Sequence, residues 1–438
     1  MKSLVLFLAI CLLSSPLSAM ELKSNEGKDY GKIDAELKAI SVVGAKSNGY
    51  DPKTGTAYLV KLKYSTPYWN HLGLGIGFYN AGDLFGLTDF DSGEKVARGL
   101  FVTNDGSEKS LMGEGYLRYK RNIFTVDLGR QLYQTPLTTI AYSTMPNFHT
   151  AFGVSTTALP DFEFSLAQMT EMSFGARAMA DFGLIGEGTG TAGAAVNPSL
   201  IGQAEFHKIS KITLGEGAPD TSGITVFSAT YSGFKKTRIS LWNYYAYDIA
   251  NNFLLQGDMG FQVKSCKLEV TAQYLMQQDV GDSLAGELDF NLFGVKAALQ
   301  GEKWLVYGAY NNSTGDTGML NAWGGDPAYT SSIFSRNEYR KRVNAFKIGF
   351  RYNILRSLAF MVSYSNYGRS ESIGKISGVG SDLTALTNAR ETDLILVYKP
   401  VKGLMVRLFY ANRTSEYDGS NGRDLTQGHT RIIVSYKF

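Results

Sequence analysis

The chain ends on Arg431-Ile-Ile-Val-Ser-Tyr-Lys-Phe438, and this stretch decides which fold the rest of the sequence can adopt. Apolar side chains occupy every second position and finish on Tyr436 and Phe438, which is the period of a β-strand. The opposite face carries Arg431 and Lys437. A row of charges fits poorly in a soluble core, and a row of aromatic rings fits poorly in water. The stretch therefore predicts a strand that separates two different media.

The same alternation recurs upstream, and in several places one row is apolar while the other carries charge or glycine. The clearest examples are residues 32–39, 58–65, 72–79, 346–352 and 404–413. A transmembrane barrel suits this pattern because it turns the apolar row to lipid and the charged row to an aqueous lumen. Closure of the barrel also pairs the last strand with the first, which leaves no unpaired backbone edge in hydrocarbon.

Short and long connections between these segments alternate along the chain. Short turns are expected at Thr66–His71, Lys120–Asn122, Ala158–Asp161, Gly233–Lys236, Lys264–Lys267, Gln300–Lys303, Asn353–Ser357 and Pro400–Gly403. Longer polar, glycine-rich segments are expected at 81–110, 172–221, 311–343, 368–390 and 413–429. Eight turns separate nine hairpins, so we predict an all-β, antiparallel transmembrane barrel of about 18 strands, with short periplasmic turns and long extracellular loops.

The first residues, 1–19, have the features of a cleaved signal peptide, and residues 20–438 are expected to form the barrel. Lys2 is followed by an apolar run from Leu4 to Leu13 that is too short to span a bilayer, and Ser18-Ala19 supply small residues for cleavage. A lipoprotein signal at Cys11 is the weaker alternative, because Ile10 is large for that motif. Cleavage leaves one cysteine, Cys266, and no internal disulfide.

The composition argues against other classes of protein. The chain is 44% hydrophobic and 13% aromatic, with 48 glycines, 10 prolines and a formal charge of +3, which is too small a bias to indicate a nucleic-acid partner. After the signal, no apolar run reaches the ~20 residues of a membrane helix.

No residues are predicted to be catalytic or to bind a metal or cofactor. The four histidines are scattered and lack metal-protease spacing, and no strong nucleophile motif surrounds any serine. Two alternatives stay open: a structural or adhesive barrel with a plugged lumen, and, less favoured, an outer-membrane hydrolase.

From the first strand to Phe438, the sequence resembles the OprD family of outer-membrane porins. Four stretches carry the resemblance: Glu114 to Gln131 with Thr135-Pro136-Leu137 after it, Ser240 to Asp248, Ala272 to Gly281, and Trp323 to Ser331. The final strand also resembles the targeting signal of outer-membrane barrels. The chain departs from the family at Tyr142 to Pro146, where an acidic and arginine pair is usual, and in the Gly- and Ala-rich segment 172–221. Both departures leave a carboxylate preference open.

The resemblance implies an integral protein of the bacterial outer membrane that admits small hydrophilic solutes by passive diffusion. It also implies loops that fold inward and a preference for small anions or carboxylates. The expected partners are these solutes, outer-membrane lipid and, through Tyr436 and Phe438, the barrel-assembly machinery. A monomer and a homotrimer are both compatible with the sequence.

Two sets of residues are expected to shape the channel. Alternation places a strip of basic residues on the lumen face: Arg407, Arg413, Arg431, Arg351, Lys61 and Lys63. Arg130 is added by its match to the family motif, but its parity groups it with the apolar face of Leu128, so either a bulge turns it inward or it anchors at the membrane interface. The alternative is that these residues are solvated and paired with acids; Asp34 and Glu36, for example, could neutralise Lys32 and Lys38. The second set is a constriction loop containing Trp323, Asp326, Pro327 and Tyr329, whose Gly-Gly-Asp-Pro turn suits a compact fold.

Overall fold

The structure is a computed structural model, and it describes most of the chain. The described residues are 20–23, 29–45, 52–140, 143–176, 204–320, 323–333, 335, 341–370, 385–418 and 425–438. Residues 1–19, where the signal peptide was predicted, lie outside this part. Within it, no helix is both long enough and apolar enough to cross a membrane.

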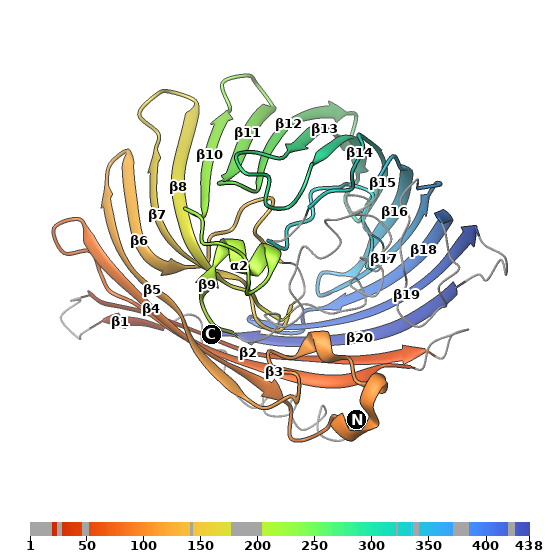
Figure 1. The fold of residues 1–438 in the computed structure, drawn as a ribbon, viewed down its shortest axis with the longest axis horizontal. Helices are drawn as coiled ribbons and strands as arrows, with labels where there is room; N and C mark the ends of the chain where they lie inside the picture. The colour runs from red at the N-terminus through yellow and green to blue at the C-terminus, as the bar shows by residue number, and fades with distance from the viewer. Residues whose placement is uncertain are drawn as a thin grey trace.

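A single antiparallel sheet curls into a closed ring (Figure 1), which confirms the predicted fold. Eighteen strands form its wall: β2 (Asp29–Ala45), β3 (Thr54–Ser65), β4 (Leu72–Asp83), β5 (Lys109–Arg121), β6 (Phe124–Gln131), β7 (Phe148–Thr156), β8 (Phe162–Ser173), β10 (Ile224–Tyr231), β11 (Thr237–Ala246), β12 (Ala250–Val263), β13 (Cys266–Gln278), β14 (Asp289–Gln300), β15 (Trp304–Thr314), β16 (Asn344–Leu355), β17 (Leu358–Tyr367), β18 (Ala385–Tyr398), β19 (Leu404–Asp418) and β20 (Leu425–Lys437). Two further strands, β1 (Met20–Lys23) and β9 (His207–Lys208), are short.

The remaining described elements are the helix α2 (Ile209–Leu214) and two 3-10 turns, η1 (Phe90–Lys95) and η2 (Arg98–Leu100). Figure 1 shows α2 and β9 inside the ring, whereas η1 and η2 lie near β3 at its edge. Helix therefore contributes nothing to the wall, but α2 is placed where it can reduce the open cross-section of the lumen.

Strand register keeps the two faces of the wall distinct. Between β16 and β17, Ile348 pairs with Tyr364 on the outer face and Lys347 pairs with Ser365 on the inner face. Because neighbouring strands place paired residues on the same side, this pattern extends around the ring. Large apolar side chains accordingly stay exposed on the outside, with Ile348 at 54% and Leu62 at 53%. Such a surface suits lipid rather than water.

The eight short turns all occur where they were predicted, each between two consecutive wall strands. Several of them contain a residue with left-handed backbone, such as Asn122 (φ 44°) and Asp161 (φ 64°), and Asn and Asp tolerate this conformation better than most side chains. The boundaries of the longer loops were less accurate. Strands β18, β19 and β20 extend into segments predicted as loops, because their loop-side ends are polar and lose the apolar row.

The seam of the barrel joins β2 to β20 along ten residue pairs, from Glu36–Lys437 to Ala45–Gly428. Beyond this ladder, the amide of Phe438 donates to the carbonyl oxygen of Ala35 at 3.0 Å, and the amide of Ala35 donates back at 2.9 Å. The ring of Phe438 packs edge-on against Tyr436 at 5.1 Å, and Tyr436 is buried. The final residue is thus part of the closure.

We expect deletion of Phe438 to prevent barrel assembly while secretion continues, because both seam hydrogen bonds and the ring contact are lost. Heat-modifiable migration on a gel tests this, since a folded barrel runs differently before boiling. Phe438→Tyr is the matched control, because it keeps the backbone and the ring. Normal heat-modifiability and outer-membrane yield after the deletion would contradict the prediction.

Candidate functional site

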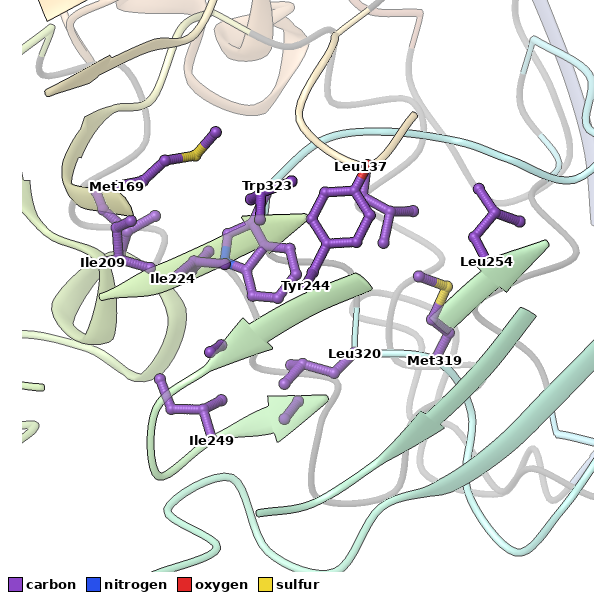
Figure 2. Packing of buried hydrophobic residues seen from close by; sticks show 14 of the residues in the cluster. Leu137, Met169, Ile209, Ile224, Tyr244, Ile249, Leu254, Met319, Leu320 and Trp323 are labelled. Carbon is purple, nitrogen blue, oxygen red and sulfur yellow. The ribbon is translucent and has the colours of Figure 1, made fainter. Parts of the chain in front are cut away.

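Three connections between wall strands meet inside the ring and narrow it. They are the described residues of the β6–β7 connection (132–140 and 143–147), the segment around α2 (204–214) and the described residues of the β15–β16 connection (315–320, 323–333, 335 and 341–343). Their apolar side chains form one buried cluster with residues of β7, β8 and β10 to β14, as Figure 2 shows for Leu137, Ile209 and Trp323. Part of the lumen is therefore filled by a hydrophobic core that the barrel shares with its own loops.

Trp323 connects these segments to one another. Its side chain is 1% exposed and lies against Tyr244 of β11, with ring centroids 6.5 Å apart and an interplanar angle of 23° (Figure 2). Its indole Nε1–H donates to Thr213 Oγ1 of α2 at 3.3 Å, and its carbonyl oxygen accepts a 2.8 Å hydrogen bond from Asn147 Nδ2. Trp323 is thus held by a wall strand, by α2 and by the β6–β7 connection.

The glycines after Trp323 allow a close approach of two backbones. Gly324 has φ +93°, and a Cβ atom on Gly325 would lie 2.2 Å from the carbonyl oxygen of Pro136. The amide of Gly325 donates to the carbonyl oxygen of Leu137 at 3.0 Å. Any larger residue at position 325 would force the β6–β7 and β15–β16 connections apart.

Asp326, Pro327 and Tyr329 follow, and all three side chains are half-buried inside the ring. Burial, and then the negative charge of Asp258 on β12, raise the pKa of the Tyr329 hydroxyl, so this group stays neutral. All four residues expected in the constriction loop therefore lie in the lumen rather than on the outer surface. We call residues 323–333 together with Ser335 the lumen segment.

The three arginines near the seam lie on the predicted inner face, but they differ in exposure. Arg407 is half-buried, with its guanidinium carbon 5.7 Å from the ring centroid of Phe409. Arg413 is only 1% exposed and is paired in register with Glu391 of β18, and Arg431 is 6% exposed. Among these arginines, Arg407 is the one that presents substantial surface to lumen water.

The two lysines of β3 also differ from each other. Lys63 forms an ion pair with the buried carboxylate of Glu114 and lies 5.1 Å from the ring centroid of Tyr116. Lys61 lies 5.9 Å from the ring of Tyr79, and among the described residues no acid is within 4.0 Å of it. The charge of Lys63 is therefore largely neutralised, whereas Lys61 makes no ion pair this close and has Glu36 of β2 as its register partner.

The glycine row of β4 makes room for this arrangement. A Cβ atom on Gly75 would lie 2.4 Å from Cζ of Tyr116, so the aromatic ring covers this part of the backbone. The guanidinium carbon of Arg118 also lies 5.1 Å from the centroid of this ring, and Arg118 pairs with Asp127. Glu114 and Tyr116 were not singled out from the sequence, although Glu114 breaks an otherwise uncharged run on its strand.

Arg351 and Arg130 complete the predicted strip. Arg351 lies on the inner face of β16, is exposed, and donates from Nε to Asn353 Oδ1 at 3.1 Å. Arg130 shares the sheet face of Leu128, and its guanidinium carbon lies 4.1 Å from the ring centroid of Phe206. The structure therefore gives Arg130 an aromatic partner but does not bring it to the seam arginines.

The described residues contain no group of three or more His, Cys, Asp or Glu side chains that could hold a metal ion. His149 and His429 are buried on separate strands, and His71 lies in a turn beside Tyr119. Cys266, at the start of β13, is half-buried.

Comparisons with known proteins agree with this architecture. The crystal structure of Pseudomonas aeruginosa OpdK with vanillate superposes with a TM-score of 0.72 at 17% identity, covering 93% of this chain and 98% of that one. Acinetobacter baumannii OccAB3 gives a TM-score of 0.71 at 15% identity, with 93% and 99% covered, and P. aeruginosa OccK9 (OpdG) gives 0.71 at 15%, with 93% and 98% covered.

The search of curated proteins found no match. The model of the family described as "outer membrane porin, OprD family" matches residues 91–438, which is well over half of the sequence. The chain therefore belongs to the OprD family of outer membrane porins.

Proposed function

We propose that this outer-membrane porin admits small hydrophilic solutes by passive diffusion and favours small anions, carboxylates among them. The observation that carries the proposal is an imbalance of charge on the lumen wall from β14 through the seam to β3. Of the inner-face acids in this stretch, Asp34, Glu36 and Asp393 each lie within 4.0 Å of a lysine, and Glu391 is paired in register with Arg413. Lys61, Lys296 and Arg351 have no acid within that distance among the described residues.

Cations without an acid within 4.0 Å create a positive field in the part of the aqueous passage that they line. The low-dielectric barrel focuses this field into the lumen, which raises the local concentration of anions. Screening acts over about 10 Å at 0.1 M salt, so a passage narrowed by loops still experiences the field. Burial of Arg413 and Arg431 leaves Arg407 as the seam arginine best placed to contribute.

The ligand present in the OpdK crystal structure, vanillate, is a small aromatic carboxylate. At 17% identity, the similarity to OpdK supports the fold rather than the choice of solute. The proposal of a carboxylate preference therefore depends on the charge pattern of this chain, which favours the same chemical class.

A structural or adhesive barrel is the second candidate, and the hydrophobic core inside the ring favours it. If that core closed the lumen, the protein would not conduct ions. Stepwise ohmic conductance of the purified protein in a planar bilayer supports the porin, whereas a silent, correctly folded barrel supports the alternative.

Replacing Arg407 with Glu should move the reversal potential in a salt gradient toward cation preference, most clearly in dilute salt. The substitution changes the local charge by two units, and charges a few ångströms apart near a wetted surface interact by roughly a few kcal/mol before screening. Uptake of a small carboxylate should fall, while uptake of a neutral sugar of similar size should change little.

Lys402→Glu is the matched control, because Lys402 lies exposed in the β18–β19 turn and carries the same charge. It should leave the reversal potential nearly unchanged. If folded Arg407→Glu channels keep the selectivity of the wild type, Arg407 is an ordinary solvated residue and the proposed role is wrong.

Excision of residues 323–332 should raise single-channel conductance and admit larger solutes, because it removes Trp323 and the chain that follows it along the inner wall. Liposome swelling with sugars of increasing size measures the second effect. Heat-modifiability identifies preparations in which the barrel has assembled. Unchanged conductance in assembled barrels would show that this stretch does not limit the passage.

A further inference from the structure

We infer that Lys347 and Glu391 are positioning residues of the constriction, which fix the lumen segment to the wall instead of serving the solute directly. The inference rests on the proposed function, because it concerns how the passage acquires its width. The charged residues of the lumen then fall into two groups: those that face passing solutes, and those that hold the lumen segment against the wall.

Four consecutive strands hold the second half of the lumen segment. The amide of Thr330 donates to Asn311 Oδ1 of β15 at 2.8 Å, and the carbonyl oxygen of Thr330 accepts from the hydroxyl of Tyr367 on β17. The hydroxyls of Ser332 and Ser365, also on β17, are 2.8 Å apart. The strands β16 and β18 add the charged contacts described next, so the segment follows the inner wall instead of hanging free in the lumen.

Lys347 and Glu391 supply the charged contacts of this attachment. From β16, Lys347 Nζ donates to the carbonyl oxygen of Ser331 at 2.7 Å and to Ser332 Oγ at 2.8 Å. From β18, a carboxylate oxygen of Glu391 accepts a 2.8 Å hydrogen bond from the amide of Ser335. Hydrogen bonds to charged groups are stronger than neutral ones, so these contacts should dominate the attachment.

Burial explains why these two charges differ from the rest of the strip. Lys347 is 9% exposed and Glu391 is 1% exposed, and Asp393 lies 3.9 Å from Lys347. A buried charge must be satisfied by partners within the protein, and here the backbone of the lumen segment supplies part of that satisfaction. Moving the segment would leave an ammonium and a carboxylate without these partners, so the charges oppose its movement.

Lys296 offers a matched comparison. It lies on the inner face of β14, 5.3 Å from the ring centroid of Tyr307, and among the described residues it makes no hydrogen bond to the lumen segment and no ion pair with an acid. Lys347→Met and Lys296→Met each remove one lumen cation and keep an unbranched side chain. Only the first removes the two hydrogen bonds to the segment.

Planar-bilayer recordings and liposome swelling should separate the two variants. We expect Lys347→Met to raise open-channel conductance, to add current noise, and to speed the uptake of a neutral sugar. Lys296→Met should change ion selectivity alone. Glu391→Leu should resemble Lys347→Met, whereas Glu391→Gln, which keeps an oxygen able to accept from Ser335, should be milder.

A reversible covalent bond provides the direct test. In a Lys347→Met chain with Cys266→Ser, the pair Ser332→Cys and Ser365→Cys places two thiols where the hydroxyls are in contact. Oxidation should restore wild-type conductance and sugar exclusion, and reduction should abolish the rescue. Should Lys347→Met fail to assemble, the same cysteine pair with Glu391→Leu makes the same measurement.

The inference is overturned if assembled Lys347→Met channels match Lys296→Met in conductance, noise and sugar uptake, or if the disulfide forms without restoring exclusion. Absence of conductance in the wild type would instead refute the proposed function, so the two failures are distinguishable.

Discussion

The structure depends on one requirement: every backbone N–H and C=O group in the hydrocarbon must find a partner within the protein. A closed sheet meets this requirement, because each strand is paired on both sides. The β2–β20 ladder, extended by the exchange between Ala35 and Phe438, is where closure is achieved. In the closed ring, alternate side chains along each strand face lipid and lumen. The apolar ones face lipid, and the charged ones therefore lie in the lumen.

A wide ring of this kind would be open if its loops stayed outside. Here the loops bring their own apolar surface into the ring and bury it against β10 to β14, with Trp323 stacked on Tyr244. On the neighbouring part of the wall, from β16 to β18, the attachment is polar and charged instead. The constriction is therefore supported in two ways, by hydrophobic packing against β10 to β14 and by hydrogen bonds to buried charges on β16 and β18.

The sequence predicted the architecture well, because the decisive signals are local. A period of two assigns each residue to a face, and turn residues such as Asn122 and Asp161 mark where strands reverse. The degree to which a side chain is buried is not specified by this local pattern. Arg407, Arg413 and Arg431 share one face, but their exposure depends on loops that are far away in sequence. Likewise, the pairing of Lys63 with Glu114 depends on register across strands β3 to β5, which alternation alone does not specify.

The absence of a side chain at Gly75 determines how a substitution there would change the channel. Because the ring of Tyr116 covers this position, a side chain added at position 75 would not enter the lumen itself but would push the aromatic ring. The ring is flanked by Lys63 and Arg118, so its displacement would move two cations with it. A single small substitution on β4 could thus alter the shape and the charge distribution of the passage together. Variation in solute preference among relatives need not require changes in the charged residues themselves.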